Sequence, residues 1–150
     1  MSRHEQLRQT LGPLPISGTA WPGWIKILAW CVMALIGAKL IQTAIGPSGQ
    51  GVNPVITASV TITFMALLVV ARCMQVSITT ITDEGIEQTW ITRRSIQWDE
   101  ITFAKFIPLL ASKRLICFTG RGRPLVFQGG TKELQIAFAQ IALVYRKRPL

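Results

Sequence analysis

Two long apolar stretches separate a polar N-terminal segment of this chain from a longer, mainly polar C-terminal part. The first stretch covers residues 24–45 and the second covers residues 54–73. About 20 helical residues cross a hydrocarbon core of about 30 Å, because each residue adds about 1.5 Å. The pattern therefore predicts a transmembrane helical hairpin within residues 24–74, preceded by a separate N-terminal segment over residues 1–23.

Beyond the second stretch, apolar and polar residues alternate with a period of two, which is typical of β-strands. Asp83-Glu84-Gly85 is a turn signal between the first two alternating runs. We expect about six short antiparallel strands, within residues 75–82, 85–92, 95–101, 101–107, 114–120 and 124–130.

The spacing becomes helical after residue 130. Thr131 is a candidate N-cap, and Leu134, Phe138, Ile141 and Tyr145 recur on one face. Residues 75–150 therefore read as an antiparallel sheet domain that ends in one amphipathic helix. With the hairpin, the predicted fold class is an α+β membrane protein.

Composition supports the membrane interpretation. Hydrophobic residues make up 49% of the 150 residues and charged residues only 15%, whereas soluble domains carry about 25% charged residues. The formal net charge of +9 would suggest nucleic acid in a soluble protein. Here the basic residues flank the hairpin while its loop, residues 46–54, has no charge. The positive-inside rule therefore places both termini in the cytoplasm, and aromatic residues do not interleave the basic ones as a nucleic-acid site requires.

A recognisable motif lies in the sheet domain. It begins with Ile81-Thr82-Asp83-Glu84-Gly85-Ile86-Glu87 and continues with Arg93-Arg94-Ser95-Ile96-Gln97-Trp98-Asp99-Glu100-Ile101. Together with the terminal helix, this order resembles the bacterial PH-like (pleckstrin-homology-like) domain family, often found fused to two membrane helices. The resemblance covers roughly residues 76–145 and implies a small antiparallel β-barrel with a C-terminal helix, in the bacterial inner membrane.

The motif residues also have a purely structural interpretation, as a turn at residues 83–85 and core positions at Ile96 and Trp98. The resemblance brings no catalytic residue, because the family is not defined by one. Phosphoinositide-binding members of the wider superfamily carry basic residues on their first hairpin. That hairpin here carries Asp83, Glu84 and Glu87, which argues against inositide recognition.

Catalytic chemistry is not indicated elsewhere. The single histidine, His4, lies in an N-terminal segment that we expect to be mobile, and no His, Cys and carboxylate cluster has metal-ligand spacing. Cys31, Cys73 and Cys117 are isolated and read as buried reduced thiols. We therefore predict a protein without catalytic, cofactor or metal site.

Basic residues are the remaining candidates for contacts. From residue 72 onward, twelve Lys and Arg stand against six Asp and Glu, and a Lys or Arg near an anionic leaflet contributes about 1 kcal/mol. Lys39, in the first apolar stretch, either extends to the outer interface or pairs with a partner or headgroup. The candidate lipid or partner contacts are Lys39, Arg93, Arg94, Lys113, Arg114, Arg121 and Arg123.

Two hypotheses follow. In the first, the PH-like domain is a protein-interaction or scaffolding module of an inner-membrane protein, an accessory subunit of a membrane complex or a self-associating chain. In the second, the basic loops bind or sense anionic lipid. The second interpretation and ordinary solvated loop charge account for these residues equally well.

Overall fold

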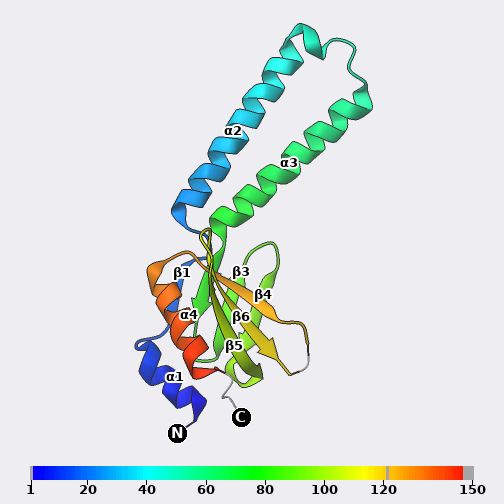
Figure 1. The fold of residues 1–150 in the computed structure, drawn as a ribbon. Coiled ribbons are helices and arrows are strands. Elements are labelled where there is room, and N and C mark those ends of the chain that lie inside the picture. Colours follow the sequence, from blue (N-terminus) through cyan, green and yellow to red (C-terminus); the bar gives the residue numbers. More distant parts are fainter. Residues whose placement is uncertain (1, 121, 147–150) are drawn as a thin grey trace. The chain divides into compact units, whose positions relative to one another are not determined.

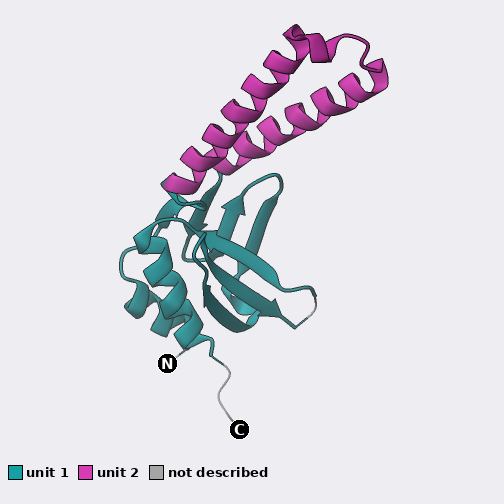
Figure 2. Ribbon diagram, turned by 45° about the horizontal axis from the view of Figure 1, so that its top comes forward, with its two compact units in different colours: residues 1–23, 76–150 teal, residues 24–75 magenta. Residues whose placement is uncertain are grey.

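The computed structural model describes residues 2–120 and 122–146. The chain forms two compact units, residues 1–23 with 76–150, and residues 24–75 (Figure 2). We refer to them as unit 1 and unit 2. Unit 1 contains all the strands of the described chain, and unit 2 is helical.

Unit 2 is a helical hairpin. Its two long helices are α2 (Gly23–Ile45) and α3 (Pro54–Val76), joined through a short 3-10 turn, η1 (Pro47–Gly49). Their most apolar windows have mean hydropathies of 1.9 and 2.2, and only 6% of each window is buried. Both helices are thus long and apolar enough to cross a membrane, and their exposure distinguishes them from the core helices of a soluble domain. A Cβ added at Gly37 would lie 3.2 Å from Phe64 Cζ, so the missing side chain lets the two helices approach.

Unit 1 consists of two antiparallel sheets and two helices (Figure 1). The first sheet has the order β1-β2-β3-β4, and the second has the order β5-β6-β7. A single 3-10 turn, η2 (Trp98–Glu100), links them. The elements are α1 (Arg3–Leu11), β1 (Ile16–Thr19), β2 (Ile78–Ile81), β3 (Gly85–Thr89), β4 (Arg93–Gln97), β5 (Ile101–Pro108), β6 (Lys113–Thr119), β7 (Leu125–Gly129) and α4 (Lys132–Val144).

The six strands and the C-terminal helix expected after residue 74 are confirmed, and Thr131 is the N-cap, with Oγ1 accepting from the Leu134 backbone N–H. Arg93 and Arg94 separate two of the expected strands, 85–92 and 95–101, and we expected a charged turn there. The turn lies instead at residues 90–92, and both arginines open β4. β4 is an edge strand of its sheet, a position where charged side chains are common.

The N-terminal segment corrects the sequence prediction. Residues 1–23 are not separate, because β1 pairs with β2 and Leu7 and Leu11 of α1 are buried in the core of unit 1. His4 is also held, with its Nε2 2.8 Å from the carbonyl oxygen of Asp83. The prediction failed because strand partners on either side of a long insertion leave no local signal. The hairpin is therefore an insertion between the first two strands of one sheet.

The core of unit 1 lies between the sheets and under α4. Tyr145, just after α4, stacks on Trp98 with ring centroids 6.3 Å apart, and its hydroxyl donates to the Trp98 carbonyl (3.2 Å). Ile96 and Trp98 are both buried, as the alternating pattern predicts. The other main core side chains are Ile81, Ile86, Leu115, Phe127, Leu134, Phe138 and Ile141.

Side chains rather than ladder hydrogen bonds connect the two sheets. Thr79 Oγ1 donates to the Gln128 carbonyl (2.7 Å), and the Gln128 N–H donates to Gln88 Oε1 (3.2 Å). Among the described residues, no strand of the first sheet forms a ladder with a strand of the second sheet. The architecture is therefore two packed antiparallel sheets with a helix. The strand pairings do not show the closed barrel that the sequence resemblance implies.

Leu7→Ala tests whether α1 belongs to the fold. Because the side chain is buried, its removal should lower the free energy of unfolding of unit 1 by about 2–5 kcal/mol. Pulse proteolysis of the full chain in detergent, over a urea series, measures this change. Gln9→Ala, at an exposed position of the same helix, serves as the control and should have little effect. Equal stability of both variants and the parent would mean that the segment is not packed.

Candidate functional site

Four of the predicted basic residues meet at one end of unit 1. Arg93 and Arg94 open β4, and Lys113 and Arg114 open β6. Arg94 is in register with Gln88 and Arg114 with Gln128. Since the Gln128 N–H donates to Gln88 Oε1, the two basic pairs belong to neighbouring parts of the two sheets.

Arg93 is the exposed member of its pair. Its Nη2 lies 2.8 Å from Glu87 Oε2 and 3.0 Å from Oε1, across β3 and β4. Ion pairs between exposed side chains contribute about 0–1 kcal/mol. Arg93 therefore remains exposed to solvent and contributes little to the stability of the fold.

Arg94 has a structural function. Its Nη1 donates to the Val126 carbonyl of β7 (3.4 Å), and its guanidinium carbon lies 5.8 Å from the Trp90 ring centroid. Trp90 in turn packs against Trp21, with ring centroids 6.4 Å apart. Half-buried between two sheets, Arg94 is less available to a ligand than its sequence position indicates.

Lys113 and Arg114 are both half-buried. The Nε atom of Arg114 is buried and has no hydrogen-bond partner in the part of the chain that the structure describes. The remaining candidates lie elsewhere. Arg123 is exposed in the β6–β7 turn at the opposite end of the strands, Lys39 is exposed on α2 in unit 2, and Arg121 lies outside the described residues.

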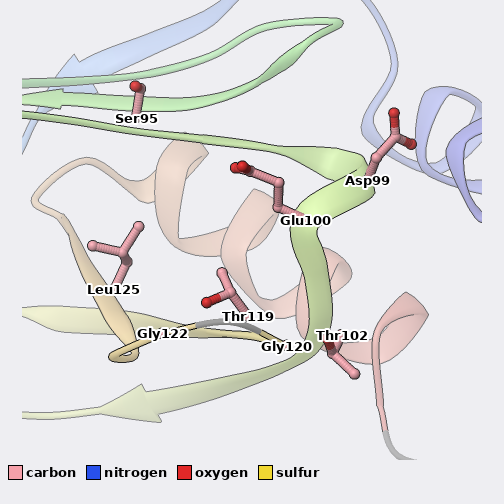
Figure 3. Close-up of a pocket in the computed structure, with 8 residues that line it drawn as sticks. All are labelled: Ser95, Asp99, Glu100, Thr102, Thr119, Gly120, Gly122 and Leu125. Atoms are coloured by element: carbon pink, nitrogen blue, oxygen red, sulfur yellow. The ribbon is translucent and has the colours of Figure 1, made fainter.

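A polar pocket, which sequence reasoning missed, opens between the two sheets of unit 1 (Figure 3). It has a volume of about 610 Å³ and lies beside β4, the edge strand of the first sheet. Its walls come from β4, η2, β5, β6, the β6–β7 turn and β7, which no local pattern could bring together. The lining residues are Ser95, Asp99, Glu100, Thr102, Thr119, Gly120, Gly122 and Leu125.

The two carboxylates of this pocket do not form a pair. Figure 3 shows Glu100 and Asp99 pointing in different directions from adjacent positions of η2. Glu100 is also occupied locally, because its Oε2 accepts from the Gln97 backbone N–H (3.2 Å). General acid–base catalysis by two carboxylates needs both directed at one substrate, so this geometry suits binding better than catalysis.

The cysteines differ in their surroundings. Cys117 is buried, as expected, and burial raises the pKa of its thiol to about 12. Cys73 is partly buried, and Cys31 is exposed on α2, where the sequence interpretation expected burial. A helix in a hairpin has few protein neighbours, which explains the difference. No group of three His, Cys, Asp or Glu side chains among the described residues could hold a metal ion.

Comparison with known proteins does not assign a function to this site. No family model, no curated protein and no solved structure matches the chain. The functional argument therefore depends on the residues and contacts described above.

Two neighbouring arginines make a matched pair for testing these roles. Arg94→Ala removes the bond to the Val126 carbonyl and the contact with Trp90, and should lower the free energy of unfolding by about 1–2 kcal/mol. Arg93→Ala removes an exposed ion pair and should cost less than about 1 kcal/mol. Urea unfolding of the full chain in detergent, followed by pulse proteolysis, compares them. A larger cost for Arg93→Ala would contradict the assignment.

Proposed function

We propose that this protein is a non-catalytic, membrane-anchored interaction module of the bacterial inner membrane. The observation that carries the proposal is the insertion of two apolar helices between β1 and β2. Such an insertion anchors unit 1 through two covalent connections, so the domain stays at the membrane surface. The order of the strands and the terminal helix supports a PH-like domain, the family that the sequence resembles.

The proposed topology has two membrane spans with both termini in the cytoplasm. Its support is the distribution of charge, since the α2–α3 loop carries none and the basic residues precede α2 or follow α3, apart from Lys26, Lys39 and Arg72 within the helices. Lys26 and Arg72 each lie within about a turn of the helix end that joins unit 1. Lys39 is near the loop end of α2, from which its long side chain can reach the outer interface.

Cysteine labelling tests this topology. In a Cys31→Ser, Cys73→Ser background, Ser48→Cys in the loop should react with a membrane-impermeant maleimide in intact spheroplasts. Ser95→Cys on unit 1 should react only after lysis. Cys117 can remain, because its burial and raised pKa keep the thiol unreactive. Labelling of residue 95 but not 48 in intact spheroplasts would reverse the proposed orientation.

The protein-interaction function is proposed for the pocket beside β4. An edge strand can pair with an extended segment of another chain, and a neighbouring pocket can select among its side chains. Ser95 of β4 lines the polar pocket and also borders a second, smaller one with Gln97 and Glu87. Glu100 adds negative charge, so an extended segment with a basic side chain is the proposed partner, within a membrane complex or a second copy of the chain.

A photoreactive amino acid at Ser95 tests this surface in the full-length protein in native membranes. Irradiation should give one discrete adduct at residue 95. The control position is Ile136, which is exposed on α4, away from β4, and should give none. Leu125→Arg, which alters the pocket lining, should reduce the adduct at least several-fold. No adduct at residue 95, or the same adduct from both positions, would contradict the proposal.

A further inference from the structure

Two turns of unit 1 expose apolar side chains to solvent. The β3–β4 turn, residues 90–92, presents Ile91 with 60% of its surface exposed. The β5–β6 turn, residues 109–112, presents Leu109 and Leu110, which are 43% and 102% exposed. Three large apolar side chains at turn tips cost solubility, since turns of soluble domains are normally polar.

Both turns lie at the same end of unit 1. In the first sheet, Thr19 pairs with Ile78 and Ile78 pairs with Thr89, so the β3–β4 turn follows the strand end where β1 stops and β2 starts. In the second sheet, Lys113 pairs with both Pro108 and Gly129, which places the β5–β6 turn beside the end of β7.

One bond joins these two ends. The Gly130 N–H donates to the Thr19 carbonyl (2.8 Å), so the end of β7 is beside the end of β1. We call this the connection end, and it comprises residues 19–21, 77–78, 89–94, 108–114 and 129–133 (Figure 1). The chain leaves unit 1 toward α2 here and returns from α3 here.

Charge is distributed unequally between the two ends of unit 1. The connection end carries Arg93, Arg94, Lys113, Arg114 and Lys132, and its one acidic residue is Glu133. The opposite end mixes both signs: Asp83, Glu84, Asp99 and Glu100 lie in the β2–β3 turn and η2, and the basic residues Arg8, Arg123 and Arg146 lie near them. An anionic surface would therefore attract the connection end more strongly than the opposite end.

Two tryptophans also belong to the connection end. The indole Nε1 atoms of Trp21 and Trp90 are both buried and have no hydrogen-bond partner among the described residues. Because both N–H groups are buried, neither indole is placed to donate to a headgroup or to water as an interfacial tryptophan does, and the two rings pack against each other instead. Trp21 lies two residues before α2 begins.

We propose that the connection end is a peripheral bilayer-contacting surface. Ile91, Leu109 and Leu110 enter the interface of the anionic inner leaflet, and Arg93, Lys113 and Lys132 contact its phosphates. This inference rests on the proposed insertion of α2 and α3 in the membrane. The connections from these helices to unit 1 are short. Thr19 and Gly23 are separated by at most about 14 Å of extended chain, and Val76 and Ile78 by about 7 Å. With α2 and α3 in the membrane, this end of unit 1 is held at the bilayer surface.

The bilayer is the favoured occupant because it explains the apolar tips, the surrounding positive charge and the tether together. A partner protein would also explain the exposed apolar side chains, but a protein-binding surface could lie anywhere on unit 1. A bilayer-contacting surface must lie at the end that is joined to the membrane helices.

Fluorescence in nanodiscs tests the surface with the full chain. Leu110→Cys is labelled with the environment-sensitive fluorophore NBD in the Cys31→Ser, Cys73→Ser background, in nanodiscs of phosphatidylcholine and phosphatidylglycerol. The matched control is Leu143→Cys, an exposed leucine (69%) near the other end of α4. Nitroxide-labelled lipid should quench NBD at residue 110 several-fold more than at residue 143, with a blue-shifted emission at 110.

The outcomes separate this inference from the proposed function. If the chain incorporates into nanodiscs but residues 110 and 143 are equally unquenched, the surface is wrong while the membrane anchor stands. A blue shift at residue 110 without quenching by labelled lipid would also overturn it, and would favour a second copy of the chain. Failure to incorporate would contradict the membrane anchor itself.

Charge reversal tests the electrostatic part. Arg93→Glu with Lys132→Glu, both exposed positions, should reduce quenching at residue 110 at least two-fold in anionic nanodiscs and change little in zwitterionic ones. Arg123→Glu with Arg146→Glu, at the opposite end, is the matched control and should leave it unchanged. Equal effects of the two double variants would show that the basic residues of the connection end have no special role.

Discussion

The antiparallel pairing of β1 with β2 is the interaction on which the remaining structure depends. Ile16 pairs with Ile81 and Thr19 with Ile78, and the Ala20 N–H continues the contact by donating to the Ser77 carbonyl (3.1 Å). Adjacent antiparallel strands bring the end of one beside the start of the next. An insertion at that point must leave and return at neighbouring positions, which a two-helix hairpin does. The pairing thereby makes the N-terminal segment part of the same domain as the C-terminal half.

Polar side chains then hold the second sheet against the first. Thr79 and Gln88 are buried, and both bond to the backbone of Gln128, while Arg94 reaches the backbone of Val126. These contacts provide hydrogen-bond partners for backbone groups on the unpaired edge of β7. Without them, these backbone groups would be buried with neither a protein nor a water partner, which is unfavourable. Their position near the strand ends leaves the other side of the sheet pair open as the polar pocket beside β4.

The same register sorts the surface chemistry. Strand pairing places four basic residues, two apolar turns and both chain connections at one end. The other end has four acidic residues in the β2–β3 turn and η2, close to Arg8, Arg123 and Arg146. The proposed protein contact uses Ser95 and the pocket beside β4, and the proposed bilayer contact uses the connection end. The two proposed surfaces share only Arg93 and Arg94, where β4 begins. A domain held by two short connections could use both at once.

Elements whose signals are local can be predicted from the amino-acid sequence alone. Continuous apolar runs specify α2 and α3, period-two alternation specifies β2 to β7, and the Thr131 N-cap with its helical spacing specifies α4. The sequence also identified the basic residues but not their roles, because whether an arginine is paired, as Arg93 and Arg94 are, depends on a neighbouring strand. Only the tertiary structure shows that β1 joins β2 across the hairpin, which segments line the pocket beside β4, and which turns lie at the same end. Those facts depend on contacts between distant residues, and a hydrogen bond such as Gly130 to Thr19 leaves no periodic trace in either segment.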